Sequence, residues 1–192
     1  GKTAGEYAPI FFKQAKYTLL DQNTFWLCEK PDSVGMVGWD AALTRIATWV
    51  KLQDKKTGQI LMVVNTHFDH IGTEARRNSA LLIIEKIKEI VGTSPAILTG
   101  DFNVSEDWDA YKTITNNEFI LKDAHKVAGK RTGVDFTYHN FGKIPAEKCE
   151  KIDFIFVTPQ IRVISSYIPF SQLNDTLFLS DHNPEIVELE IK

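Results

Sequence analysis

Residues 95–103 read PAILTGDFN, an apolar run that ends in a glycine followed by polar side chains. The run at 95–99 predicts a buried strand, and Asp101 and Asn103 come directly after it. Such an Asp-x-Asn pair is often only the turn that closes a strand. Strand ends are also where a rigid scaffold directs functional side chains into a shared cleft. The stretch therefore predicts a central strand with a candidate site at its end.

Outward from this strand, short apolar runs alternate with turns, and one segment has helical periodicity. Residues 60–66 (ILMVVNT) are almost all apolar, which predicts a strand buried on both faces. Residues 73–91 repeat apolar side chains at helical spacing and are followed by Gly92, a typical C-cap. The other expected elements are strands at 9–13, 25–29, 45–52, 152–157, 162–168 and 185–191, a hairpin turn at 55–58, a helix at 106–114 capped by Ser105, and a mostly irregular segment at 123–149. This mixed order predicts an α/β sandwich rather than a repeating doubly wound sheet.

The composition is ordinary for one globular domain: 43% of the 192 residues are hydrophobic and 24% are charged. The net charge of −3 argues against a protein that gathers nucleic acid through a global basic field. No apolar run approaches the roughly 20 residues of a membrane-spanning helix, and no zinc-binding cysteine spacing occurs. A soluble protein is expected, and its compartment (secreted, periplasmic or cytoplasmic) stays open.

Three further polar groups lie at the ends of apolar runs. His67 follows the run at 60–66, Asp153 opens the run at 153–157, and Asp181 and His182 precede the last strand. Taken singly, an Asp before a strand is usually a turn or cap residue, and a lone His is usually a satisfied structural residue. Together, carboxylates, imidazoles and an amide that converge at strand ends suit the metal-assisted attack of water on a phosphate.

The segments that carry these groups resemble the endonuclease/exonuclease/phosphatase superfamily. They are THFDH (66–70), RRNSALLI (76–83), GDFN (100–103), KIDFIFV (151–157) and SDHNP (180–184), and they follow the superfamily's order from about Tyr7 to Lys192. The superfamily includes pancreatic-type deoxyribonucleases, apurinic endonucleases, bacterial sphingomyelinases, inositol polyphosphate 5-phosphatases and deadenylase-like phosphatases. The segments GWD (38–40) and RIATW (45–49) are most similar to bacterial members. The resemblance implies a single domain over 1–192, with the four-layer α/β/β/α sandwich of deoxyribonucleases.

The resemblance also implies roles in catalysis for four of the residues. Asp101 and Asn103 would orient or deprotonate the attacking water, and Asn103 would also contact the scissile phosphate. His67 and His182 would donate hydrogen bonds to the phosphate oxygens and stabilise the charge that develops in the transition state. The expected reaction is the hydrolysis of a phosphodiester or a phosphomonoester.

Two acidic residues complete the implied site. Asp153 would accept a hydrogen bond from His182, which fixes the tautomer of the ring and favours its cationic form. Asp181 would help to hold Mg²⁺ or Mn²⁺, directly or through water, because these ions prefer oxygen ligands. The expected partner is a phosphate ester: a small molecule, a lipid head group or a nucleic acid. The acidic balance of the chain favours smaller substrates over duplex DNA.

The sequence departs from the superfamily pattern at its start. Superfamily domains open with an Asn-bearing strand and then a Glu that is the principal metal ligand, and neither has a counterpart here. Glu6 precedes a strand in a loop position, so it is not assigned this role. The chain is therefore expected to lack the N-terminal third of the domain and to associate through exposed sheet edges. The alternative function is a non-catalytic binding module on the same fold, which would be inactive because it lacks that Glu.

Other polar residues have structural interpretations. Arg45 lies in a buried-looking strand and needs a carboxylate partner, either at the cleft floor or in the core, because an unpaired buried charge is costly. His70, His125 and His139 are expected to be structural, although His70 and Asp69 could line the cleft entrance.

Overall fold

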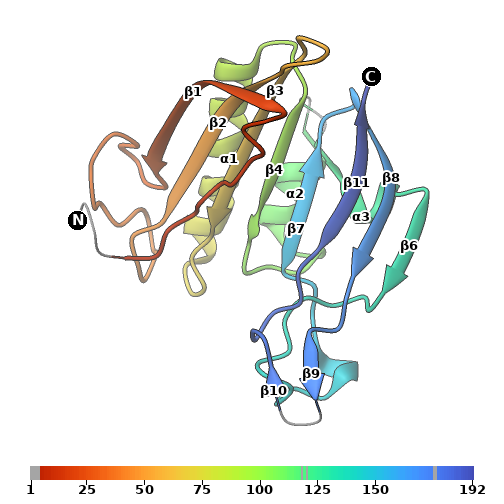
Figure 1. The fold of residues 1–192 in the computed structure, drawn as a ribbon. Helices are drawn as coiled ribbons and strands as arrows, with labels where there is room; N and C mark the ends of the chain where they lie inside the picture. Colours follow the sequence, from red (N-terminus) through yellow and green to blue (C-terminus); the bar gives the residue numbers. More distant parts are fainter. Residues whose placement is uncertain (1–4, 118, 120, 175–176) are drawn as a thin grey trace.

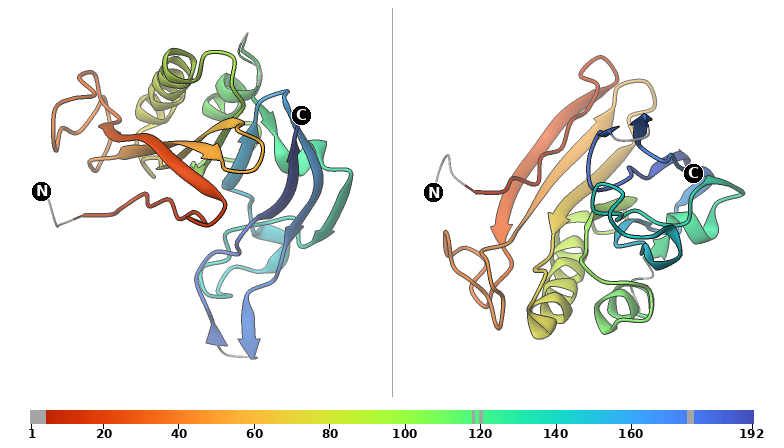
Figure 2. Two further views of the ribbon diagram at one scale, coloured as in Figure 1. Left: turned by 45° about the horizontal axis from the view of Figure 1, so that its top comes forward. Right: turned by 90° about the horizontal axis from the view of Figure 1, so that it is seen from below.

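The computed structural model of the protein describes residues 5–117, 119, 121–174 and 177–192. Two main sheets pack against each other, and the long helix covers the outer face of the larger sheet (Figures 1 and 2). The larger sheet has the strand order β1 (Tyr17–Trp26), β2 (Ile46–Asp54), β3 (Ile60–His67), β4 (Ala96–Asp101), β7 (Asp153–Val157) and β5 (Lys122–Asp123). The expected mixed α/β sandwich is thus confirmed.

The second sheet is smaller, and a separate pair of strands extends beyond it (Figure 1). The three-stranded sheet has the order β11 (Ile186–Ile191), β8 (Ile161–Ile168) and β6 (Lys130–Gly133), and the separate pair is β10 (Leu177–Phe178) and β9 (Gln172–Asn174). The helices are α1 (Thr73–Val91), α2 (Asp109–Thr115), the single turn α3 (Ala124–Val127) and the 3₁₀ turn η1 (Ala146–Lys148). No helix in the described part of the chain is long and apolar enough to cross a membrane.

Strand β3 separates two hydrophobic cores. Met62 and Val64 belong to the cluster between the six-stranded sheet and the helices, whereas Leu61 and Val63 face the three-stranded sheet. This alternation explains why the whole run is apolar, and it confirms that the strand is buried on both faces. The ends of β3 and β4 are therefore held from both sides.

Helix α1 has the bounds that the sequence predicts. It buries Ile83 and Ile87 against the six-stranded sheet and ends at Gly92, which has a φ of 58°. The N-cap residue of the helix, Gly72, has no side chain that could cap the first turn. Instead, the carboxylate of Asp40 accepts hydrogen bonds from the backbone amides of Glu74 and Ala75, which fixes the 38–44 loop to the helix.

The prediction of strands at 9–13 and 25–29 is wrong. The first segment has no regular structure; Phe11 is 92% exposed and Pro9 lacks an amide donor. The second is only the end of β1, which begins at Tyr17 and pairs antiparallel with β2. Most of β1 is exposed and polar, so it lacks the apolar alternation by which strands are recognised.

The short helix begins later than the sequence predicts. Ser105 does not cap it, because the Ser105 hydroxyl donates to the carboxylate of Asp107, and α2 begins after Trp108. The remaining predicted strands lie within two residues of their observed bounds. The 123–149 segment contains only short elements, as expected. Association through exposed sheet edges stays a prediction; β1 forms one such edge, with Leu20 45% exposed.

Replacing Gly100 by alanine is expected to lower the free energy of unfolding by about 2–3 kcal/mol. Gly100 has a φ of 155°, and a Cβ there would collide with the carbonyl oxygen of Thr66 on the neighbouring strand. Gly92→Ala is the matched control. A Cβ at Gly92 meets open space, so only the strain of positive φ remains, about 1 kcal/mol. Urea unfolding of both variants measures the difference, and equal costs would contradict the steric explanation.

Candidate active site

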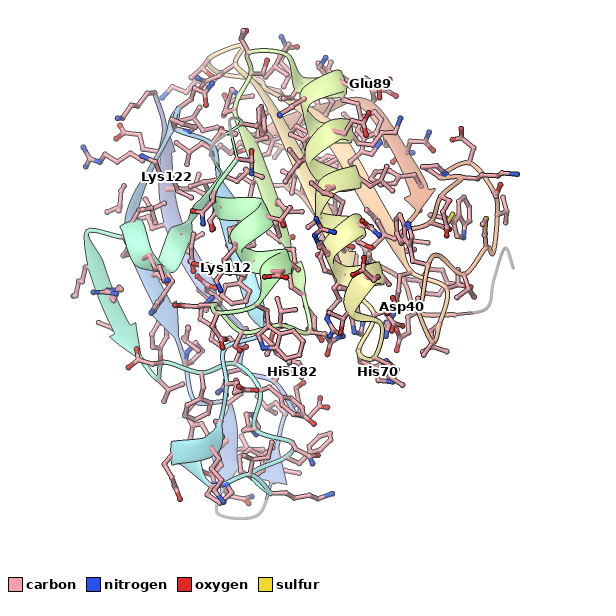
Figure 3. All side chains as sticks on the ribbon, turned by 180° about the vertical axis from the view of Figure 1, so that it is seen from behind. Asp40, His70, Glu89, Lys112, Lys122 and His182 are labelled. Atoms are coloured by element: carbon pink, nitrogen blue, oxygen red, sulfur yellow. The ribbon has the colours of Figure 1, made fainter. Side chains whose placement is uncertain are left out.

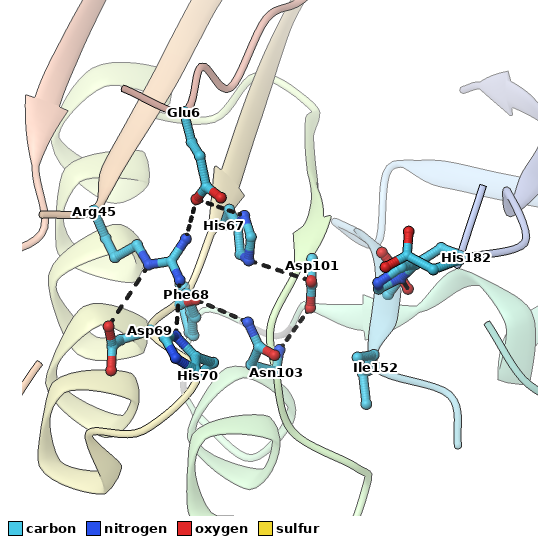
Figure 4. A network of polar contacts seen from close by, with 12 residues as sticks. Glu6, Arg45, His67, Phe68, Asp69, His70, Asp101, Asn103, Ile152 and His182 are labelled. Atoms are coloured by element: carbon cyan, nitrogen blue, oxygen red, sulfur yellow. Dashed lines mark hydrogen bonds and ion pairs between the residues drawn. The ribbon is translucent and has the colours of Figure 1, made fainter. Parts of the chain in front are cut away.

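The predicted site residues come together because the six-stranded sheet aligns them. β3 and β4 are parallel, with His67 opposite Asp101, and β4 and β7 are antiparallel, with Asp101 opposite Asp153. His182 reaches the same edge from the loop before β11. Figure 4 shows His67, Asp101 and His182 in one row, and Figure 3 shows His182 and His70 on the same edge of the molecule.

Short distances link the members of this row. The Nε2 atom of His67 lies 3.3 Å from Oδ2 of Asp101. The Nδ1 atom of His182 lies 2.7 Å from Oδ2 of Asp153, a charge-assisted hydrogen bond. Ligand atoms of Asp101, Asp153 and His182 lie within 4.8 Å of one another. The prediction that His67, Asp101, Asp153 and His182 lie close together is confirmed.

The loop after β4 is built around Asn103. This residue has a φ of 50°, a left-handed conformation that asparagine tolerates better than most residues. Its backbone amide donates to Oδ1 of Asp101 at 2.9 Å, and its side-chain amide donates to the carbonyl of Phe68 at 3.0 Å. Asn103 thus links the ends of β3 and β4 and holds the carboxylate of Asp101 in place.

The carboxyl of Asp101 is the most perturbed acid of the site. Burial, reinforced by the nearby charge of Asp153, raises the pKa of Asp101 from 3.8 to about 6, against the hydrogen bond from the Asn103 amide. Burial alone would lower the pKa of His182. The hydrogen bond and charge of Asp153, with the charge of Asp101, outweigh it, so the pKa of His182 is raised. The site therefore pairs a weakly acidic carboxyl with a readily protonated imidazole.

His67 lies between two carboxylates. Its Nδ1 atom is 3.4 Å from Oε2 of Glu6, and its Nε2 faces Asp101. Burial, followed by the nearby charge of Arg45, lowers the pKa of His67. A neutral ring carries one proton and can donate to only one of its two acidic neighbours.

Arg45 anchors the other side of the row. Its buried guanidinium forms an ion pair with Glu6, lies 3.7 Å from Asp69, and is 3.2 Å from Nδ1 of His70. Arg45 thus has both expected kinds of partner, an exposed carboxylate at the cleft and a buried one. Although burial raises the pKa of Asp69, hydrogen bonds from backbone amides, first that of Gly72, lower it to about 2. Asp69 is a structural anchor for its loop.

Asp181 is the predicted residue that the structure does not bring into the close group. Its side chain accepts from the hydroxyl of Ser180 at 3.3 Å, and its carbonyl accepts from the His139 amide. Its charge still contributes to the raised pKa of His182, whose ring lies 4.9 Å from that of Tyr138. Asp181 therefore acts on the site through its charge, from outside the close group.

Two features near the site are not evident from the sequence. The first is the contact of Glu6 with both Arg45 and His67, since nothing in the N-terminal segment indicates that it folds back onto β3. The second is Thr137, whose buried hydroxyl accepts from the backbone amides of Ile152 and Asp153. Thr137 lies in a segment without periodicity, so no sequence pattern singles it out.

The donor set fits a hard divalent cation. Two carboxylates, from Asp101 and Asp153, lie next to each other beside one imidazole, and carboxylate oxygens are preferred by Mg²⁺ and Mn²⁺. A pocket of about 400 Å³ adjoins the group, lined by Asp153, His182, Leu179 and Pro184 among others. A larger groove, about 780 Å³, borders Glu6 instead.

The chain belongs to the Endonuclease/Exonuclease/phosphatase family, whose model matches residues 10–182. It is 64% identical to a solved Bacteroides vulgatus member, with a TM-score of 0.95, over 99% of this chain and 72% of that one. A mannosyl-6-phosphatase of Bacteroides thetaiotaomicron is 34% identical, with a TM-score of 0.85, over 94% and 69%.

A similar curated protein is an uncharacterized protein of Acanthamoeba polyphaga mimivirus, 30% identical over 175 residues. The match covers 86% of this chain and 63% of the viral protein. The chain thus spans less than two thirds of the length of this relative. The family membership supports a hydrolase.

Proposed function

We propose that the chain carries the active site of a metal-dependent phosphate-ester hydrolase. The observation that carries the proposal is the Asp153–His182 hydrogen bond of 2.7 Å directly beside Asp101. A carboxylate-bound imidazole donates well to a phosphate oxygen, and the neighbouring carboxylate of Asp101 can accept a proton from water.

Each residue has a distinct part in the proposed reaction. Asp101 takes the proton from the attacking water, and Asn103 orients that water and contacts the phosphate. His182 donates from Nε2 to a phosphate oxygen, because its Nδ1 is held by Asp153. His67 donates from Nε2 once a phosphate oxygen takes the place of its Asp101 contact.

Asp101 and Asp153 would hold Mg²⁺ or Mn²⁺ within this site, with Asp181 reaching it through water. The ion would polarise the phosphate and lower the pKa of the bound water. The Glu that the family resemblance implies as principal ligand is not assigned to any residue of the chain. The activity is therefore proposed for the protein that contains these 192 residues.

The favoured substrate class is a phosphomonoester of a sugar or a similar small polyol. A similar solved structure, 34% identical over 94% of this chain, is a mannosyl-6-phosphatase. The net charge of −3 also favours a small substrate over a long polyanion. The non-catalytic binding module is not favoured, because a scaffold does not need the residues of the site to keep this arrangement.

A substrate panel with Mn²⁺ or Mg²⁺ tests the function. Mannose 6-phosphate and p-nitrophenyl phosphate are expected to release phosphate. Bis-p-nitrophenyl phosphate and single-stranded DNA are expected to react at least about tenfold more slowly, if the site is specific for monoesters. Faster diester cleavage would reassign the substrate class, and no hydrolysis of any member would support the binding module.

Removal of divalent cations is expected to abolish the activity reversibly. EDTA should lower kcat at least about 100-fold, since the metal supplies charge stabilisation that the side chains alone do not. Stoichiometric Mn²⁺ should restore it, and Mn²⁺ binding can be followed separately by isothermal titration calorimetry. Full activity in EDTA after dialysis would rule out the metal requirement.

A further inference from the structure

A buried ion pair links the two sheets close to the site. The Nζ atom of Lys151 lies 2.8 Å from Oε2 of Glu185, and the side chains are only 7% and 3% exposed. Burying a lysine and a glutamate is costly, and apolar residues of similar volume would often give an equally stable fold. Stability alone therefore does not explain why the fold contains an ion pair that is almost completely buried.

The positions of the two residues suggest that explanation. Lys151 is two residues before Asp153, and its Nζ also donates to the Asp153 carbonyl at 2.7 Å. Glu185 is three residues after His182 and directly precedes β11. The ion pair therefore joins the same two segments as the hydrogen bond between Asp153 and His182. One segment belongs to the six-stranded sheet and the other leads into the three-stranded sheet.

The surroundings of the pair fix its geometry. The Lys151 ammonium lies 3.9 Å from the ring centroid of Phe154, a cation–π contact. The hydroxyl of Ser166 lies 3.4 Å from Oε1 of Glu185, and that same hydroxyl is 2.8 Å from Nδ1 of His125. Both charged groups thus make several contacts of defined geometry. Besides neutralising each other, they fix the distance between the segment before β7 and the segment before β11.

We propose that Lys151 and Glu185 are positioning residues, which hold Asp153 and His182 in register across the two sheets. A displacement of either segment would lengthen the 2.7 Å hydrogen bond and turn Nε2 of His182 away from the phosphate. The catalytic consequence rests on the proposed function, whereas the effect on the His182 ring does not. A pair with a purely structural role would change the stability of the protein and leave the ring unaffected.

The test replaces the pair by apolar residues and observes the His182 ring directly. In the Lys151→Met/Glu185→Leu variant, labelled with ¹⁵N-histidine, we expect the Nδ1–H proton of His182 to exchange with water at least about tenfold faster than in wild type. With Mn²⁺ and the substrate, kcat is expected to fall about 10- to 100-fold while KM stays unchanged, since a small misplacement of a catalytic group affects mainly the transition state.

Two variants complete the experiment. Glu185→Gln keeps an acceptor for Lys151 and should retain the slow exchange. Thr158→Val removes a buried hydrogen bond to the Ala96 amide at the far end of β7, so it should lower stability without changing the His182 signal. If the double variant does not fold, Lys151→Met/Glu185→Gln, which also leaves no buried charge unpaired, gives the same readout.

A folded Lys151→Met/Glu185→Leu variant that keeps wild-type exchange at His182 would overturn the proposal. An inactive wild-type protein in which the variants still differ in exchange would count against the proposed function and leave the positioning role supported.

Discussion

Replacing His182 by alanine is expected to lower kcat for phosphate-ester hydrolysis about 1,000-fold, with little change in KM. The ring is held by Asp153 through Nδ1, which leaves Nε2 to donate to the phosphate. The raised pKa of His182 means that the ring keeps its proton, and the stabilisation it provides, to a higher pH than a free histidine. The donor matters most in the transition state, where negative charge on the phosphate oxygens is redistributed. The loss should therefore appear in kcat.

Two comparisons make this experiment specific. Asp153→Asn keeps the size of the side chain but no longer favours the cationic ring, so kcat should fall about 100-fold and the alkaline limb of the pH profile should move to lower pH. His70 is exposed, and its ring is hydrogen-bonded to Arg45. The control variant His70→Ala should therefore change kcat no more than roughly threefold. Equal activity of His182→Ala and wild type, with melting curves showing both folded, would remove His182 from the mechanism.

Replacing Asp101 by asparagine is expected to abolish the activity and stabilise the metal-free protein. The native pKa of about 6, against 3.8 for a free carboxyl, means that burial disfavours the charged form. A pKa difference of that size corresponds to about 3 kcal/mol at pH 7 for a side chain that is only 17% exposed. Asparagine can still accept from the Asn103 amide and carries no charge, so most of this penalty should disappear.

The pH dependence provides the check on this result. Because the native pKa is raised, stability is lost as the pH rises from about 3.8 to about 6. The gain from Asp101→Asn should therefore be full at pH 7 and less than half as large near pH 4.5, where native Asp101 is already protonated. Calorimetry in EDTA measures it, and Asp135→Asn, at a fully exposed carboxylate, should change stability by less than about 0.5 kcal/mol. A destabilised Asp101→Asn variant would contradict the account.

The sequence predicts the parts of the molecule in which local pattern and burial coincide. Helix α1 has helical periodicity, and the strand that ends at Asp101 is a short apolar run. Both have clear ends, so their bounds and the polar residues that follow are predictable. The approach of His67, Asp101 and Asp153 follows once the strands pair in order, because the sheet register places these residues opposite one another.

Features that depend on tertiary contacts are not predictable in this way. Strand β1 is mostly exposed, so its formation depends on pairing with β2 and not on its own apolar pattern. Glu185 is one of three glutamates in the last strand region, and only its buried contact with Lys151 distinguishes it from Glu188 and Glu190. The contact of Glu6 with Arg45 joins residues whose sequence separation carries no periodic signal.

The central claim is that side chains between positions 67 and 182 form a single phosphate site, and a crystal structure with Mn²⁺ and inorganic phosphate tests it most directly. We expect anomalous density for the ion beside Asp101 and Asp153, with phosphate oxygens within hydrogen-bonding distance of both His67 and His182. Ion and phosphate bound away from these four residues, at concentrations that saturate the protein, would contradict the claim.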